Sequence, residues 1–429
     1  MNITRTLLFA TGLSLFGAGA CSSAPAVDVP EAEKYFTAED IARGGTRARQ
    51  SRALWIVAVL WSIGALVVLS HPRVGTWFVS VVWRVVGSDD GASTARRIAG
   101  TVATIAGLLV AYFLLRGPFV WARGFFLEHA WDLSNQTAGA FLWDWVKAVL
   151  VTTVMYTVAI AAIVVLRGFL PTWWPVAGWA ATSAFIVFMV LVYPVAIDPL
   201  FHTFTPVTET EVRERAQRIA EKAGLEIGEV LWVDASSRTK RTNAYFTGLG
   251  ATKRIVLYDT LKDEDGSVST STLDEVETIL AHEAGHWRGG HMLKGTALAV
   301  LGTGVFFLAL WLLTKSGASW LPDASLPAGA RLGTMVLLLA TALQYLSMPV
   351  VNAISRSWER EADSASLELS GKPEAFIRAE VELSRRNISQ IRPGAFAVFW
   401  LYTHPPVLER IAMAERYRAE REASPAGGE

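Results

Sequence analysis

The chain has 429 residues, of which 52% are hydrophobic and only 18% are charged, and its formal net charge is zero. Soluble domains average roughly 25% charged residues, so this balance points to a membrane protein. The neutral charge, and the lack of a basic patch interleaved with aromatic residues, give no reason to expect nucleic acid as a partner. The single cysteine, Cys21, excludes an internal disulfide and any cysteine-based zinc site downstream of it.

The first 21 residues resemble a secretory signal. Arg5 precedes an apolar run from Leu7 to Phe16, and small residues lead up to Cys21. This pattern predicts a signal peptide ending in a lipobox, with Cys21 as the lipidated first residue. The alternative is an uncleaved first apolar segment. Residues 22–52 are then a tether and a juxtamembrane segment.

Six later segments are long and apolar enough to span a bilayer, which takes about 20 residues, and contain no Asp, Glu, Lys or Arg. They are Ala53–Ser70, Ile98–Leu115, Ala148–Leu166, Pro175–Ile197, Gly295–Thr314 and Leu332–Val351. A weaker candidate, Val74–Gly87, is short and contains Arg84, so it predicts either a seventh span or a helix lying in the membrane interface. The sequence therefore predicts N-terminal transmembrane helices within residues 53–197 and two more within residues 295–352.

The two groups of spans are separated by a soluble insertion, residues 198–294. Glu209–Ala223 predicts a charged amphipathic helix ended by Gly224, and Glu229–Val233 and Arg254–Tyr258 predict strands, with Gly248 and Gly250 in the turn before the second strand. After the last span, a polar helix is expected from Ser355 to Leu369 within a helical C-terminal part, residues 353–422. Residues 423–429 are expected to form a tail. The predicted fold is mainly α: a polytopic membrane protein with about seven transmembrane helices and a small α+β domain.

The most informative motif is His282-Glu283-Ala284-Gly285-His286. Histidines four residues apart stand on one face of a helix and can share a tetrahedral zinc ion, while the adjacent glutamate can take a proton from water activated by the metal. Thr272 is expected to cap this helix, with Glu275 completing a capping box. An apolar stripe on the same helix consists of Leu273, Val276, Ile279 and Leu280.

A zinc ion needs a third protein ligand, and Glu359 on the polar helix is the preferred candidate. Asp363 lies one turn further on the same face and could accept a hydrogen bond from a ligand imidazole, or could instead pair with Arg356 or Arg410. His291 is placed about 140° round the helix from His286 and is expected to line the cavity or the membrane interface. Glu361 is expected to point elsewhere, into solvent.

Four motifs together resemble the type I CAAX prenyl endopeptidases, which are multi-span zinc metallopeptidases of the gluzincin group. The motifs are HEAGH, the SRxxExxAD pattern of Ser355–Asp363, Asn243-Ala244-Tyr245-Phe246 followed by Lys253–Leu257, and His404-Pro405-Pro406 with Glu409-Arg410. Residues 198–206 and 126–141 are also similar to family segments, so the resemblance covers roughly residues 35–415. Arg241-Thr242 departs from the His-Ser that is typical of eukaryotic members, and the apparent signal suggests a bacterial member.

The resemblance implies a role for each motif. One Zn²⁺ per chain would be bound by His282, His286 and Glu359, and Glu283 would be the general base. Asn243, Ala244, Tyr245 and Phe246 would form an edge strand that holds an extended peptide. His404 and Arg410 would donate hydrogen bonds to the oxyanion, or Arg410 would lock Asp363 in place. In the family the spans form a barrel around a water-filled chamber.

The predicted function is therefore that of an integral-membrane zinc metalloendopeptidase. Its partners would be the lipid bilayer and a peptide or protein substrate that is prenylated or membrane-associated. A bacterial inner membrane with a cytoplasmic catalytic domain is the favoured location. Two alternatives remain open: a quality-control protease of broad peptide specificity, and a non-catalytic binding protein in which zinc only stabilises the helix ends.

Overall fold

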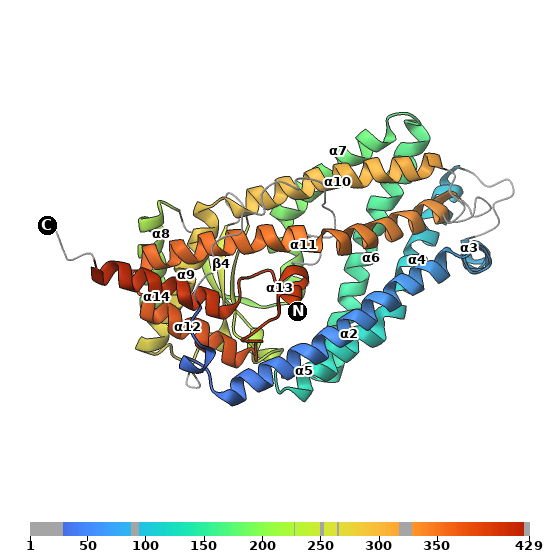
Figure 1. The fold of residues 1–429 in the computed structure, drawn as a ribbon. Helices are drawn as coiled ribbons and strands as arrows, with labels where there is room; N and C mark the ends of the chain where they lie inside the picture. The colour runs from blue at the N-terminus through green and yellow to red at the C-terminus, as the bar shows by residue number, and fades with distance from the viewer. Residues whose placement is uncertain are drawn as a thin grey trace.

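The computed structural model describes residues 29–86, 94–226, 228–248, 253–263, 266–316 and 328–423. The predicted signal and Cys21 lie outside the described residues, as do the start of the tether and residues 424–429 of the predicted tail. Long helices run side by side through one half of the molecule, and a small sheet with shorter helices occupies the other half (Figure 1).

Six helices of the described chain are long and apolar enough to cross a membrane. They are α2 (Ala38–Ser70), α4 (Thr94–Trp121) continuing through the π-helix η2 (Ala122–Phe126) into α5 (Leu127–Ala130), α6 (Ala138–Phe169), α7 (Trp174–Val192) continuing through η3 (Tyr193–Ile197) and η4 (Asp198–Leu200), α10 (His291–Ser316) and α11 (Ala328–Ser370). The weaker seventh candidate forms α3 (Pro72–Val86), whose 15 residues reach only about 22 Å, short of a hydrocarbon core of about 30 Å.

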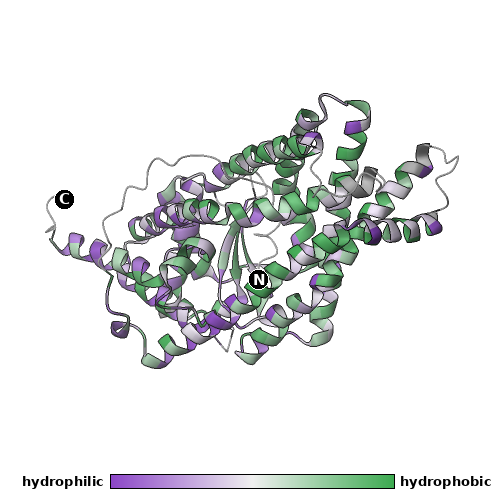
Figure 2. Cartoon of the chain, turned by 45° about the vertical axis from the view of Figure 1, so that its right-hand side comes forward, coloured by the Kyte–Doolittle hydropathy of each residue, from purple (hydrophilic) through white to green (hydrophobic). Residues whose placement is uncertain are grey.

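The long helices pack on one another and also expose apolar side chains outward. Leu66, Ile105 and Phe307 are fully buried between them, whereas Val154 and Leu301 are more than 60% exposed. A wide exposed apolar surface on long helices fits lipid contact. Figure 2 shows the hydrophobic residues along these helices and the hydrophilic residues gathered toward the end that carries the C-terminus. The predicted polytopic membrane fold is confirmed.

Helix α11 is 43 residues long and joins the last span to the predicted polar helix without a break. Hydropathy changes between Val351, the predicted end of the span, and Ser355, the predicted start of the polar helix, but the helix continues through this stretch and through Pro349 just before it. The change in composition marks the exit from the apolar environment and not the end of a helix. Glu359 and Asp363 are consequently carried on a direct extension of the last span.

The soluble part contains a four-stranded sheet in the order β1-β2-β4-β3. The strands are β1 (Phe204–Pro206), β2 (Glu229–Val233), β3 (Ala244–Thr247) and β4 (Arg254–Tyr258). Strand β2 is parallel to β4 and antiparallel to β1, and β3 is antiparallel to β4. Strands β2 and β4 have the predicted bounds. Strand β3 lies at the edge of the sheet, and no further strand of the described chain pairs with its outer side.

Two helices pack on this sheet: α8 (Thr210–Ala223) and α9 (Thr270–Arg288). Trp232 and Leu257 from the sheet share a buried core with Leu273 and Leu280 of α9. Helix α8 ends at Gly224, which has φ +67° and so takes the left-handed conformation that glycine adopts without strain.

The C-terminal helices close the domain. They are α12 (Pro373–Arg386), α13 (Ala395–Leu401) and α14 (Val407–Ala423). A separate core joins Phe376 and Ile411 of this region to Leu367 of α11 and to Phe36, just ahead of α2. The juxtamembrane segment before the first span is therefore packed into the domain that follows the last span.

Candidate active site and metal centre

Helix α9 carries the HEAGH motif and begins three residues earlier than predicted. Ser269 occupies its N-cap position without a capping side-chain hydrogen bond. Thr272 is already inside the helix, where its hydroxyl contacts the Ser269 hydroxyl at 2.8 Å. Glu275 lies 3.5 Å from Arg378 and reaches no helix terminus. The predicted capping box is wrong, while the apolar stripe does face the sheet: Leu273, Val276 and Leu280 are buried.

Gly285, the fourth residue of the motif, sets the distance between α9 and α11. A Cβ atom at this position would lie 2.9 Å from both Ala362 Cα and Ala365 Cβ. The two helices therefore touch through small residues, which lets their backbones approach closely. The Ser366 hydroxyl adds a hydrogen bond across the same contact by donating to the Thr278 carbonyl at 2.6 Å. This close contact brings the third candidate ligand to the two histidines.

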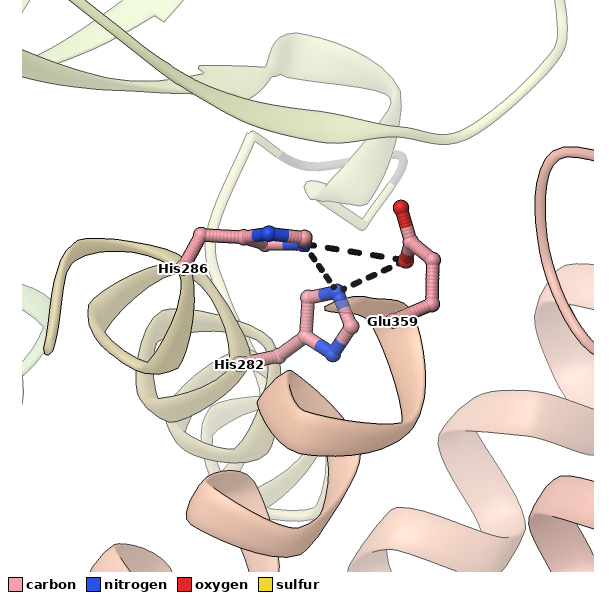
Figure 3. Close-up of side chains that lie close together, drawn as sticks. All are labelled: His282, His286 and Glu359. Carbon is pink, nitrogen blue, oxygen red and sulfur yellow. Dashed lines mark hydrogen bonds and ion pairs between the residues drawn. The ribbon is translucent and has the colours of Figure 1, made fainter. Parts of the chain in front are cut away.

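His282, His286 and Glu359 meet at one point (Figure 3). The Nε2 atoms of the two histidines are 3.1 Å apart. Glu359 Oε2 lies 3.3 Å from His282 Nε2 and 3.6 Å from His286 Nε2. One donor atom from each residue lies within 4.8 Å of the other two, and no other group of this kind occurs in the described ranges.

The donor set fits a divalent metal ion. The Glu359 side chain is only 3% exposed, and none of the neighbouring ring nitrogens is aligned to give its Oε2 a hydrogen bond. A buried carboxylate oxygen without a donor is costly unless a cation neutralises it. Two imidazoles and one carboxylate are the protein ligands of a catalytic zinc site that keeps a fourth position open.

His282 is held from its other side by a buried ionic cluster. Its Nδ1 lies 2.8 Å from Asp363 Oδ1. Burial alone would lower the pKa of His282, but the contacts with Asp363 and Glu359 outweigh burial and raise this pKa to about 10. The surroundings of the ring thus strongly favour positive charge, whether that charge is a proton or a metal ion.

Asp363 is in turn clamped by Arg410. The Arg410 Nε and Nη2 atoms donate to the two Asp363 oxygens at 2.8 and 2.5 Å, and Nη1 donates to Glu380 at 2.6 Å. With all three nitrogens engaged, Arg410 is oriented as a lock on Asp363 and not toward an oxyanion. Arg356, the other predicted partner, donates instead to the carbonyls of Val398 and Tyr402.

His404 reaches the same centre from the loop between α13 and α14. Its Nε2 lies 3.2 Å from Glu359 Oε2, and its side chain is 39% exposed. The neighbouring Thr403 hydroxyl contacts His404 Nδ1 at 2.9 Å. Glu283 is half-buried beside the histidines, and within the described chain its carboxylate makes no hydrogen bond or ion pair. Both side chains are therefore available to a bound substrate.

The predicted environment of His291 is wrong, whereas Glu361 is exposed as predicted. Helix α9 ends at Arg288, and His291 begins α10, so the helical angle used in the prediction does not apply. His291 is buried: its Nδ1 lies 2.9 Å from His286 Nδ1 and its Nε2 lies 3.0 Å from Glu361 Oε2. Glu361 is partly exposed but is paired. The sequence offered one signal for this turn, the Gly289-Gly290 pair, which interrupts the helical pattern.

The predicted substrate strand begins at Ala244, one residue after Asn243, whose side chain is exposed. The side chains of this strand attach it to the rest of the molecule. The Tyr245 hydroxyl donates to Asp198 at 3.1 Å, which ties the strand to the end of the fourth candidate span. The Phe246 ring packs at 4.1 Å from the Trp287 ring on α9. The outer backbone edge of β3 is thereby fixed close to the helix that carries the histidines.

Two family models match the chain in succession. "CAAX prenyl protease N-terminal, five membrane helices" matches residues 25–203, and "Peptidase family M48" matches residues 206–418. The chain belongs to peptidase family M48. It is an integral-membrane metallopeptidase of the CAAX prenyl protease type, and the reading as a non-catalytic binding protein is disfavoured.

The M48 relatives span plants, fungi and bacteria. "CAAX prenyl protease 1 homolog" of Oryza sativa subsp. japonica is 27% identical over 359 residues, covering 82% of this chain and 81% of the relative. "CAAX prenyl protease 1" of Saccharomyces cerevisiae is 31% identical over 237 residues, covering 51% of each chain. "Uncharacterized metalloprotease YhfN" of Bacillus subtilis is 28% identical, covering 79% of this chain and 80% of the relative.

A solved structure shares the fold of this M48 chain. The crystal structure of S. mikatae Ste24p matches with a TM-score of 0.75 at 24% identity, and the match covers 90% of both chains. The arrangement of the long helices beside the small α+β domain is therefore a fold that this solved structure shares.

Proposed function

We propose that this chain is a zinc endopeptidase that hydrolyses peptide bonds in membrane-associated substrates. The observation that carries the proposal is the meeting of His282, His286 and Glu359 around a buried carboxylate oxygen without a hydrogen-bond donor. These three residues would hold one Zn²⁺ per chain. When bound, zinc would acidify a water molecule and polarise the scissile carbonyl.

Glu283 would serve as the general base. Its carboxylate neighbours the first ligand histidine and has no competing partner in the described chain, so it is free to accept a proton from the attacking water. The same group would then deliver the proton to the leaving amine. His404, partly exposed beside Glu359, would donate a hydrogen bond to the oxyanion that develops on the substrate carbonyl.

Asp363 and Arg410 would act by positioning. Asp363 would keep the His282 ring oriented from its Nδ1 side, and the bidentate contact with Arg410 would keep Asp363 in place. The contacts with Asp363 and Glu380 hold all three guanidinium nitrogens of Arg410, so we assign the oxyanion role to His404 alone.

The outer edge of β3 would bind the peptide. An extended substrate can add to an edge strand through main-chain hydrogen bonds, which leaves its side chains free to enter pockets. Ala244, Tyr245 and Phe246 would supply the backbone groups, and the exposed Asn243 would add a side-chain hydrogen bond. The contact between Phe246 and Trp287 would hold this edge at the correct distance from Glu283.

The substrate class follows from the relatives. Several are named CAAX prenyl protease 1 or its homologue, so a peptide with a prenylated cysteine near its C-terminus is the proposed substrate. A bacterial inner membrane with the peptidase domain on the cytoplasmic side is the proposed location; the similarity to a Bacillus protein supports the bacterial assignment. Purified protein in detergent should cleave a farnesylated Cys-a-a-X peptide faster than an unprenylated control. Equal rates would favour broad peptide specificity.

The catalytic assignment is tested by Glu283→Gln. The variant should bind zinc in a ratio near one per chain, as the wild type does, while its peptide hydrolysis falls by a factor of at least about 100. Glu368→Gln, at an exposed position on the neighbouring helix α11 and outside the proposed chemistry, is the matched control and should keep activity within a few-fold. Near-normal turnover by Glu283→Gln would remove the proposed base.

A further inference from the structure

We propose that His291 and Glu361 are positioning residues for the metal centre, which hold His286 in the one tautomer that can bind a metal through Nε2. The inference rests on the proposed ligand set. It adds a second series of contacts that orients a ligand, separate from the series through Asp363 and Arg410. In the structure two groups stand in line behind the ligand His286: His291 and then Glu361.

The contacts form a continuous series. His286 Nδ1 lies 2.9 Å from His291 Nδ1, and His291 Nε2 lies 3.0 Å from Glu361 Oε2. The side chain of His291 is only 5% exposed, so water cannot easily replace either contact. Glu361 is about half exposed, and its carboxylate lies 3.9 Å from Lys294 Nζ, which helps to hold it in place.

Proton positions along this series are fixed by the chemistry of its ends. The Glu361 carboxylate oxygen accepts from His291, so the proton of His291 is on Nε2, and His291 Nδ1 is left as an acceptor. His286 must then place its own proton on Nδ1 and donate it to His291. The lone pair of His286 Nε2 is thereby exposed toward His282 and Glu359, where a metal would bind.

The residues around His291 fix the position of its ring. Gly290 has φ +63°, a conformation suited to glycine, and turns the chain between α9 and α10. At Gly289 an added Cβ would lie 2.4 Å from His291 Nε2, so a side chain there would displace the ring. On the other side the ring stacks on Trp358, with centroids 5.2 Å apart and an angle of 9° between the planes.

Both ligand histidines are therefore supported from α11, close to the ligand that α11 itself supplies. Glu361 lies two residues after Glu359 and supports His286 through His291, whereas Asp363 lies four residues after Glu359 and faces His282 directly. One segment of a single helix thus provides a ligand and both anchoring carboxylates. This arrangement explains why a buried histidine and a partly exposed glutamate pair at this point.

Three substitutions separate hydrogen bonding from packing. His291→Phe keeps an aromatic ring on Trp358 but removes the acceptor. His291→Asn loses the ring but keeps an amide oxygen near the position of Nδ1. Gly289→Ala leaves a backbone of φ −72° that alanine tolerates, and pushes the His291 ring away from its contacts. The readout is the zinc dissociation constant of metal-free protein in detergent, measured by competition with a chromophoric chelator.

We expect zinc affinity to fall about 10- to 100-fold in His291→Phe and Gly289→Ala, and to stay within a few-fold of wild type in His291→Asn. Glu361→Leu should weaken zinc binding, and Glu361→Gln, which keeps an acceptor, should not. A packing role predicts the reverse order, with His291→Phe retaining affinity and His291→Asn losing it, and that result would overturn the inference. Wild-type protein that binds no zinc would instead overturn the proposed function.

Discussion

Gly285 on α9 lies so close to Ala362 on α11 that a methyl group at residue 285 would stand 2.9 Å from the Ala362 Cα atom. The nearest atoms include backbone, which cannot swing aside as a flexible side chain would. The contact joins the helix of two candidate ligands to the helix of the third. The spacing of these helices is therefore fixed by the absence of one side chain.

Gly285→Ala should consequently loosen the metal centre without touching a ligand. We expect a loss of stability of about 1–3 kcal/mol from overpacking and a fall in zinc affinity of about tenfold or more, because Glu359 moves away from the histidines. Thermal unfolding and zinc titration would measure the two effects. Gly295→Ala, where a Cβ would meet only Trp358 at 3.7 Å, is the control and should change neither. Unchanged zinc affinity in Gly285→Ala would show that the contact does not set the site.

Arg410→Leu should be among the most destabilising single substitutions in the domain. It would leave Asp363 and Glu380 buried without their cation, and breaking a buried ion pair in this way costs about 3–5 kcal/mol. Arg360, whose pair with Glu409 is nearly half exposed, offers a matched control. Arg360→Leu should cost about 1 kcal/mol or less. Comparable losses in the two variants, measured by chemical denaturation, would contradict the proposed lock.

Glu380 gives the fold a pH dependence. Burial is the main cause that raises the pKa of Glu380 to about 7; Arg410 opposes the rise and Asp363 adds to it. Because this pKa is higher in the folded protein than the ordinary glutamate value of 4.5, folding favours the protonated form. The stabilisation is complete below about pH 4.5 and is lost as the pH rises through about 7.

Glu380→Gln should abolish that dependence, since glutamine imitates the protonated acid. The difference in melting temperature between the variant and the wild type should shift in favour of the variant between about pH 5 and about pH 8. The Glu382 side chain is exposed on the same helix, so Glu382→Gln should show the same change of melting temperature with pH as the wild type. If the melting temperatures of the wild type and of Glu380→Gln changed in parallel with pH, Glu380 would not titrate in this range.

Removal of the metal should lower the stability of the wild type. A ligand that binds only the folded state stabilises it by mass action, by about 4 kcal/mol at a thousandfold excess over its dissociation constant. Incubation with a chelator should therefore lower the melting temperature, and added Zn²⁺ should restore it. Glu359→Ala, which lacks the third candidate ligand, should respond little to either treatment. An identical response of the variant would exclude Glu359 as a ligand.

Sequence patterns predicted the parts of this molecule that depend on local periodicity. The apolar spans, the β2 and β4 strands and the helix through His282 and His286 each follow from a repeat that is visible within one segment. Periodicity within one segment could not show that Glu359 meets those histidines, because it lies on another helix. The ligand types that zinc accepts and the family resemblance both indicate Glu359, and the geometry of the pairing depends on the contact at Gly285.

The errors arose where a local rule was extended past its end. His291 was placed by assuming that α9 continues, although Gly289 and Gly290 stop it and turn the ring back onto His286. Thr272 was chosen as a cap because its type suited the position, but the helix already starts at Thr270. In both cases the residue type was a useful signal, but the predicted position of the helix end was wrong.

The unbroken course of α11 has a mechanical consequence. The helix of 43 residues extends for about 65 Å, with the lipid-facing part at one end, Glu359 toward the other and Pro349 between them. A proline inside a helix removes one backbone hydrogen bond and allows the helix to bend. The stiffness of α11 at Pro349 therefore decides how far a change in bilayer thickness would move the carboxylate relative to the two imidazoles, which makes the membrane itself a determinant of how well the centre is assembled.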